Sequence, residues 1–234
     1  MRRGTLRSTL VIGGLFLLAG NAEAQRSRGP GGFVGISFVA ADAVGDLGFV
    51  VDQGFGMDLA AGAPVSAGGH LRVRADLGFV IYGLEQIRYC SFGCRVASDL
   101  TTTNSIIFWG IGPELVLARG PIQPYLHASA GLSYFVTSSS VDDNDGYGPY
   151  LETTNYSDLV FGWKFGGGLR LRVGGGHNPI YLDFGVERHD NGIANYLTVG
   201  DIVDNQDGSI TIYPNRSEAD LIAFHVGVSV GLPS

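Results

Sequence analysis

Apolar and polar residues alternate along most of the chain from Gly32 onward. A period of two residues is that of a β-strand, whose successive side chains point to opposite faces of a sheet. Clusters of glycine, proline and aspartate interrupt the alternation, and no helical period occurs beyond the N-terminal residues. The pattern predicts eight strands, at residues 33–41, 53–63, 70–82, 103–118, 123–137, 158–173, 179–190 and 218–232. Each has roughly the 9 to 11 residues, or more, that a tilted strand needs to cross a membrane.

The connections between these strands alternate in length. Three are tight turns, at residues 64–69, 119–122 and 174–178. Three are long, polar and acidic, at residues 83–102, 138–157 and 191–217, and the connection at 42–52 is intermediate. Consecutive connections of an antiparallel meander lie at opposite ends, so all the long ones fall on one side, as in outer-membrane barrels. The sequence therefore predicts an all-β protein, an eight-stranded antiparallel up-and-down transmembrane β-barrel.

The two faces of each predicted strand differ in chemistry. In residues 158–173, Phe161 and Phe165 lie on one face, whereas Lys164 and Arg170 lie on the other among several glycines. Glycine has no side chain, so it leaves space for long side chains that project from facing strands. The interior of an eight-stranded barrel is just wide enough for side chains to fill. We therefore expect the charged face to point into the lumen and the apolar face to meet lipid.

Three large aromatic residues support this orientation. Trp109, Tyr134 and Trp163 all fall on the apolar face, near the ends of the strands that lead into the long connections. Tryptophan and tyrosine gather at membrane–water interfaces, so these residues are expected to form an aromatic belt.

The inward face carries equal numbers of basic and acidic residues. The expected cations are Arg72, Arg74, Lys164, Arg170 and Arg172, and the expected anions are Asp58, Asp76, Glu114, Asp183 and Glu187. Charges in a confined lumen are costly unless they are paired, so this balance predicts an ion-pair network that plugs the barrel. Pro113 lacks an N–H group and predicts a bulge that would reverse the facing of the residues after it, which leaves the place of Glu114 open.

The N-terminus has the features of an export signal. Arg2, Arg3 and Arg7 precede an apolar run at residues 10–20, and Ala22-Glu23-Ala24 has the small-x-small cleavage pattern. The expected organisation is a signal peptide at residues 1–24, a linker at 25–32 and a barrel at 33–232. Cleavage removes three basic residues and one acidic residue from the totals of 15 and 22, which leaves 12 against 21 and a net charge of −9. A chain so acidic is not expected to bind nucleic acid.

At this point the sequence resembles the small outer-membrane barrels of the OmpA/OmpX type. The resemblance covers residues 32–232 and rests on the architecture and on short stretches such as 110–115, 123–126, 130–134 and 225–232. It implies location in the outer membrane of a diderm bacterium, in contact with outer-membrane lipid and lipopolysaccharide. The chain departs from the group by ending in Leu232-Pro233-Ser234, where many members have an aromatic residue, and by the absence of a peptidoglycan-binding domain.

Candidate catalytic and metal sites are weak. His127-Ala128-Ser129 is similar to the His-x-Ser of lipid A deacylases, but both groups face the lumen near the short-turn end, which favours a packed histidine. The acidic stretches 141–146 and 204–208 both fail the EF-hand pattern, because counting back from the glycine at position six puts Val141 and Val203 at position one. We expect no catalytic residues, no metal and no cofactor.

Two classes of function remain. The first is a monomeric, non-enzymatic outer-membrane protein with a plugged lumen, whose long loops contact an extracellular ligand or surface. The alternative is a narrow porin-like channel for small polar solutes, and a lipid A-modifying hydrolase is more remote. The equal numbers of basic and acidic residues expected in the lumen favour the first class. A conducting lumen is expected to be wider and to carry an excess of charge of one sign.

Cys90 and Cys94 are predicted to form a local disulfide. They are the only cysteines of an exported chain, and the loop between them contains Gly93. Thiol labelling of the denatured, non-reduced protein is expected to modify neither residue. Labelling of both would contradict the pairing.

Overall fold

The computed structural model describes residues 31–91, 96–143, 151–207 and 209–233. The elements are β1 (Phe33–Val44), the 3-10 helix η1 (Leu47–Phe49), β2 (Gln53–Pro64), β3 (Leu71–Ser91), β4 (Val96–Val116), β5 (Ile122–Asp143), β6 (Leu151–Gly174), β7 (Ile180–Asp190), β8 (Ile193–Tyr196), β9 (Ile202–Asp204), β10 (Ile210–Ile212), β11 (Asn215–Glu218) and β12 (Asp220–Gly231). Their bounds support the predicted strands, except that β3, β4, β5 and β6 are much longer than predicted.

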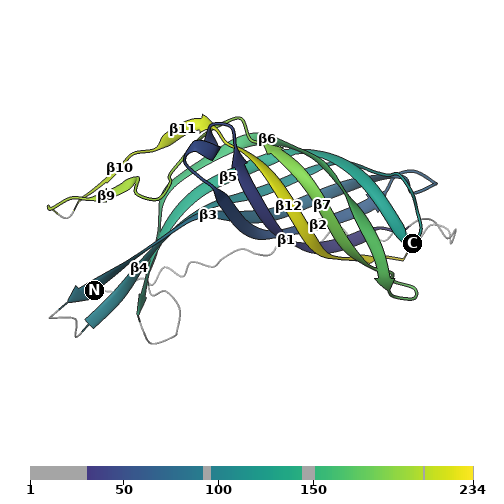
Figure 1. The fold of residues 1–234 in the computed structure, drawn as a ribbon, viewed down its shortest axis with the longest axis horizontal. Helices are drawn as coiled ribbons and strands as arrows, with labels where there is room; N and C mark the ends of the chain where they lie inside the picture. Colours follow the sequence, from purple (N-terminus) through teal and green to yellow (C-terminus); the bar gives the residue numbers. More distant parts are fainter. Residues whose placement is uncertain (1–30, 92–95, 144–150, 208, 234) are drawn as a thin grey trace, which may run out of the picture.

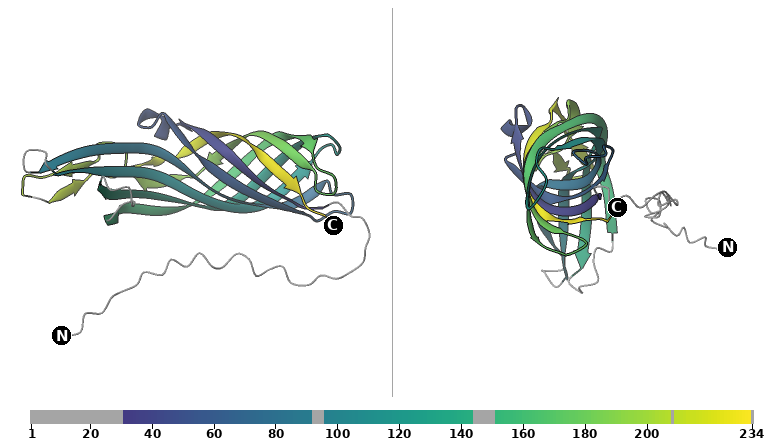
Figure 2. Two further views of the ribbon diagram at one scale, coloured as in Figure 1. Left: turned by 90° about the horizontal axis from the view of Figure 1, so that it is seen from below. Right: turned by 90° about the vertical axis from the view of Figure 1, so that its right-hand side faces the viewer.

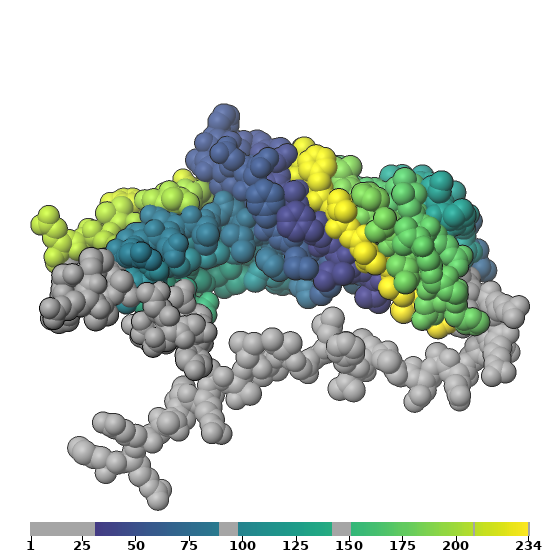
Figure 3. Space-filling view, turned by 60° about the horizontal axis from the view of Figure 1, so that its bottom comes forward, coloured from purple at the N-terminus to yellow at the C-terminus, as the bar shows by residue number. Residues whose placement is uncertain are grey.

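Eight of these strands close into a barrel (Figure 1). Its order is β1-β12-β7-β6-β5-β4-β3-β2, with β2 paired to β1, and every neighbouring pair is antiparallel. Figure 3 shows β12 lying directly between β1 and β7, where the first and last strands close the wall. The predicted eight-stranded antiparallel barrel is confirmed.

The outward face of the barrel is apolar around its circumference. Its exposed side chains include Ile36, Phe38, Leu59, Leu77, Phe79, Ile111, Leu126, Phe161, Phe165, Phe184, Val226 and Val228. A closed barrel satisfies its backbone hydrogen bonds without water, and an apolar exterior replaces contact with water by contact with lipid. The protein is therefore an integral barrel of the outer membrane. None of the helices in the described ranges is long and apolar enough to span a bilayer.

Four strands continue beyond the closed barrel. β3, β4, β5 and β6 have 21 to 24 residues, whereas the other four barrel strands have 11 or 12. Figure 2 shows these long strands extending from one end of the barrel, opposite the C-terminus. Much of residues 83–102 and 138–157 is therefore strand, and the prediction of irregular loops there was wrong.

The polar composition of these extensions explains the difference. Thr102 and Ser139 face each other across β4 and β5 with their hydroxyl oxygens 2.8 Å apart, and Arg88 binds both carboxylate oxygens of Asp99 across β3 and β4. Threonine favours strands, and polar cross-strand pairs stabilise a sheet without an apolar face. Because the alternation of apolar and polar residues fades in these segments, periodicity alone does not detect them.

The long connection between β7 and β12 folds as two hairpins. β8 pairs with β11, and β9 pairs with β10. In the second hairpin, Asp207 accepts hydrogen bonds from the hydroxyl and the backbone N–H of Ser209. These two hydrogen bonds hold the pKa of Asp207 below its usual range, and the bond from the hydroxyl has the larger effect.

Several predictions fall outside the described residues. They are the signal peptide at 1–24, most of the linker at 25–32, the pairing of Cys90 with Cys94, and most of the acidic stretch 141–146.

Candidate functional site

The lumen contains a carboxylate that three arginines share. Glu114 projects inward from β4, and its side chain has no solvent exposure. Arg170 binds it with two nitrogens, Nη1 at 2.8 Å and Nη2 at 2.7 Å from the two carboxylate oxygens. Arg72 and Arg74 each approach it at 3.4 Å through Nη1. The two-pronged contact of Arg170 is the strongest of the three, because both bonds are short and charge-assisted.

Arg170 is fixed by a second carboxylate and by two aromatic rings. Its Nε donates to Asp183 Oδ2 at 2.9 Å, and its guanidinium carbon lies 3.9 Å from the ring centroid of Phe33 and 4.1 Å from that of Tyr125. The hydroxyl of Tyr125 donates to Asp183 Oδ1 at 2.7 Å. Arg170 therefore has carboxylate partners for all three of its guanidinium nitrogens and an aromatic ring close to its guanidinium carbon in both Phe33 and Tyr125.

A second group of charges lies around Asp76. Arg74 Nε donates to Asp76 Oδ1 at 2.6 Å, and Lys164 Nζ lies 3.5 Å from Asp76 Oδ2. Arg74 Nη2 is also 3.9 Å from Asp58, and Lys164 lies over the ring of Phe108 at 4.6 Å. Arg74 thus links this group to Glu114.

Glu187 is paired with histidines rather than with lysine or arginine. His189 Nε2 lies 2.6 Å from one of its carboxylate oxygens, and His127 Nε2 lies 3.4 Å from the other. The sequence predicts a lysine or arginine partner for Glu187 and a packed His127 in the lumen, but it does not pair either histidine with Glu187. Their positions on the inward face of β5 and β7 were the available signal.

Arg172 does not join these groups. It is exposed, donates from Nη2 to the carbonyl of Gly175 at 2.8 Å, and makes no ion pair with any carboxylate in the described ranges. The register of β6 and β7 shifts between Arg172 and Gly174, where β6 leaves the barrel. Its expected place in a buried ion-pair network was wrong. Of the ten expected lumen residues, the other nine are buried: the four basic side chains Arg72, Arg74, Lys164 and Arg170, and the five carboxylates.

Pro113 produces no bulge. Pairing between β4 and β5 is interrupted at Gly112 and Pro113, and it resumes in the same register at Glu114, which faces His127. The missing N–H group breaks the ladder locally without adding a residue, so the facing of the following side chains is preserved. Glu114 therefore points inward.

Glycines on the inward face leave space for the lumen side chains. A Cβ atom at Gly168 would lie 2.5 Å from the hydroxyl of Tyr125, and one at Gly185 would collide with the ring of His225. Larger residues at these positions would displace groups that hold Asp183 and Arg170.

An apolar layer lies at the outer end of the lumen. Its buried members include Val80, Tyr82, Ile106, Phe108, Phe135, Tyr196, Leu197 and Leu221. Tyr196 and Leu197 come from the β7–β12 connection, and the hydroxyl of Tyr82 donates to the carbonyl of Leu197 at 3.0 Å. We call β8, β11 and Leu197 the outer cap. The sequence predicts only a long polar connection for these residues.

Hydrogen bonds hold the outer cap on the extended strands. Asn195 donates through its backbone and side-chain nitrogens to Asp158 Oδ2 of β6, at 2.7 and 2.9 Å. Below it, Asn191 accepts from the hydroxyl of Ser133 at 2.6 Å and donates to the carbonyl of Ala219 at 2.7 Å. Packing and specific polar contacts therefore hold the cap at the outer end of the lumen.

The remaining candidate residues lie on the wall. Trp109 and Trp163 are exposed on the outward face, and Tyr134 is half-buried there. Their role as an interfacial belt stays a prediction.

His127 and Ser129 are buried in the lumen with no hydrogen bond between them, and no group of three or more potential metal ligands occurs in the part of the chain that is described.

Comparisons with known proteins bear on the fold. No family model and no curated protein matches the chain. Neisserial surface protein A has 15% sequence identity and a TM-score of 0.44, with coverage of 86% of this chain and 97% of that chain. The attachment invasion locus protein of Yersinia pestis, in complex with a heparin analogue, has 9% identity and a TM-score of 0.48, covering 87% and 99%.

A major outer membrane protein from Thermus thermophilus is also similar, with 14% identity, a TM-score of 0.40 and coverage of 85% and 99%. At these identities the likeness concerns the fold alone. The closed, eight-stranded antiparallel barrel itself agrees with the predicted resemblance to small outer-membrane barrels of the OmpA/OmpX type.

The buried charges predict a large effect of removing Arg170. Arg170→Ala leaves Glu114 without its two shortest bonds and Asp183 without its cation, and loss of one partner of a buried pair costs about 3–5 kcal/mol. We expect a corresponding fall in the free energy of unfolding, measured by urea titration in lipid vesicles.

Arg88→Ala is the matched control, because it breaks an arginine–carboxylate pair in which the arginine side chain is 66% exposed. Solvent screens such a pair, so no measurable change in stability is expected. Equal effects of the two substitutions would contradict the importance of the buried network.

Proposed function

We propose that this protein is a sealed outer-membrane barrel, whose lumen is a rigid plug and whose extended outer end contacts a ligand or surface outside the cell. The observation that carries the proposal is the continuous filling of the lumen. Its charged layer around Glu114 and Asp76 is followed by the apolar layer and then by the outer cap.

The free volumes in the structure agree with a seal. The open space at the short-turn end is lined at its base by Arg170 and Gln123, both buried. A cavity further along, beside Phe108 and Lys164, has about 10 Å³, which is close to the minimum that holds one water molecule. A hydrated path for ions would need wider space than this.

The pairing of lumen charges points the same way. Ion-selective pores carry rings of one charge that attract a permeating ion. Here Glu114, Asp76 and Asp183 each bind an arginine within 2.9 Å, so these carboxylates are already neutralised by the protein. We infer that the network stabilises the barrel and blocks it.

The outer end has the exposed surface that a contact role requires. The connections at 45–52, 83–102, 138–157 and 191–217 contain 11 acidic and 3 basic residues, a net charge of −8. Apolar side chains are exposed among them, including those of Phe49, Val203, Ile210 and Tyr213. An acidic surface with exposed apolar groups favours a cationic partner and disfavours a sulfated polysaccharide.

One observation favours the alternative of a narrow channel. Several buried polar atoms in the lumen have no hydrogen-bond partner among the described residues, including Asp58 Oδ1, Lys164 Nζ and Ser129 Oγ. Buried polar groups of this kind usually bind water, so the middle of the lumen is a candidate for hydration. A connected file of water through the apolar layer would convert the plug into a pore.

Conductance separates the two functions. Purified protein in a planar bilayer is expected to show no steady current, because the apolar layer and the outer cap interrupt any file of water. Arg170→Ala is expected to leak or to unfold, since it opens space beside unpaired carboxylates. Steady wild-type current, with altered ion selectivity and unchanged stability in Arg170→Ala, would favour the channel.

The charge of the outer end predicts its binding preference. Cells that display the protein, compared with cells that lack it, are expected to adhere more strongly to a surface coated with a cationic polypeptide, and the difference should shrink as salt increases. Adhesion to a heparin-coated surface is expected to be unchanged. Stronger adhesion to heparin would contradict the proposed partner chemistry.

A further inference from the structure

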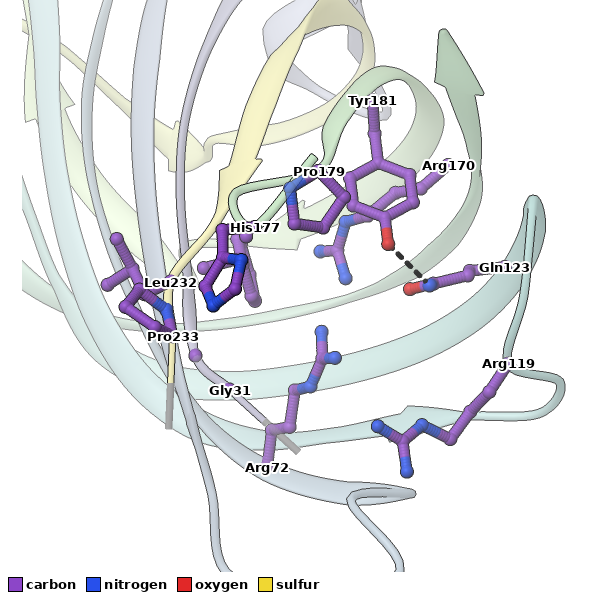
Figure 4. Close-up of a pocket in the computed structure, with 13 residues that line it drawn as sticks. Gly31, Arg72, Arg119, Gln123, Arg170, His177, Pro179, Tyr181, Leu232 and Pro233 are labelled. Atoms are coloured by element: carbon purple, nitrogen blue, oxygen red, sulfur yellow. Dashed lines mark hydrogen bonds between the residues drawn. The ribbon is translucent and has the colours of Figure 1, made fainter. Parts of the chain in front are cut away.

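The short-turn end of the barrel holds an open cavity of about 410 Å³ (Figure 4). We call it the periplasmic mouth, since short turns face the periplasm in barrels of this kind. Its polar lining consists of Arg72, Arg119, Gln123, Arg170, His177 and Tyr181, and its apolar lining includes Phe33, Pro179, Leu232 and Pro233. Figure 4 shows the three guanidinium groups and the imidazole of His177 arranged around one open space.

The charge of the periplasmic mouth is one-sided. Three arginines line it, and no carboxylate does so within the described ranges. Glu114 and Asp183 lie behind Arg170 and are already bound by it. The mouth is therefore positive in a chain whose overall charge is negative, and the long connections at the opposite end are strongly acidic.

Arg72, which lines the mouth, has an incomplete set of hydrogen bonds. It is buried, with a relative exposure of 6%, and its nearest carboxylate oxygen is that of Glu114 at 3.4 Å from Nη1. Its Nε is buried and has no hydrogen-bond partner among the described residues. A buried cationic donor without a partner is costly, and an anion in the mouth would supply the missing acceptor.

Other donors are available around the same space. Gln123 Nε2 donates to the hydroxyl oxygen of Tyr181 at 2.9 Å, so the tyrosine acts as acceptor there and its own hydrogen is free to be donated. Arg119 uses Nη1 to bind the carbonyl of Gly68 at 2.5 Å, which fixes its guanidinium group at the rim. Its side chain is otherwise exposed to solution.

We propose that the periplasmic mouth binds a small, multivalent, water-soluble oxyanion of the phosphate type, with Arg72 and Arg119 as its principal ligands. Planar guanidinium groups match the oxygens of phosphate, and several of them around one cavity favour an anion with more than one negative charge. The cavity lies within the ring of strand ends rather than on the apolar outward face, which favours a soluble anion over a lipid head group.

The test is calorimetric titration of the purified full chain with pyrophosphate, in a zwitterionic detergent and 150 mM NaCl, without phosphate buffer. Saturable binding of one anion per protein is expected. Arg119→Ala should weaken it about tenfold or more, because a charged donor at the rim is lost. Arg88→Ala, which removes an exposed arginine at the opposite end, should leave it unchanged.

A second readout follows Arg72 directly. The NMR signal of its Nε–H group is expected to shift on addition of pyrophosphate, and Arg72→Gln should abolish binding. A folded barrel is expected to migrate differently on a denaturing gel before and after boiling. If Arg72→Gln shows identical migration, it has not folded, and the binding measured for Arg119→Ala alone then tests the proposal.

Two results would overturn the proposal. One is the absence of saturable binding, or binding that is the same in the wild type and in Arg119→Ala. The other is retention of an anionic phospholipid in native mass spectrometry, lost in Arg119→Ala and not displaced by pyrophosphate, which would identify a lipid head group as the ligand.

Discussion

The structure depends on the requirement that charges enclosed in a narrow barrel find partners. Glu114 meets this requirement for three arginines, and Arg170 links it to Asp183 while stacking between Phe33 and Tyr125. Removing one member leaves its partners charged in a space with little room for water, so the cost exceeds that of an exposed pair. Because the arginines and carboxylates of the network come from β3, β4, β6 and β7, the network also fixes the relative positions of these four strands.

The two ends of the barrel differ in structure and in charge. At the outer end, long strands and the β7–β12 connection bring Tyr196 and Leu197 over the lumen, and an acidic surface faces the exterior. At the short-turn end, the lumen widens into a mouth lined by arginines. In the proposed function, a sealed centre separates these two ends, so that the acidic exterior and the basic mouth would each bind a different partner without passage between them.

Much of this arrangement follows from local rules in the sequence. The alternation of residues determined which side chains of β3 and β6 face inward, because a strand repeats every two residues. It could not specify which charges meet, since that depends on register across the barrel, as Glu187 and its histidines show. Arg172 lies at the last paired position before a register shift and is exposed there, Pro113 broke the ladder without a bulge, and Tyr196 reached the core from a segment with no strand pattern.

The most direct test is a double-mutant cycle between Arg170 and Glu114. Unfolding free energies would be measured for Arg170→Met, Glu114→Gln and the double variant in lipid vesicles. If this contact organises the lumen, the double variant should lose less than the sum of the single losses, with a coupling free energy of about 2 kcal/mol or more. Additive losses, within about 0.5 kcal/mol, would contradict it.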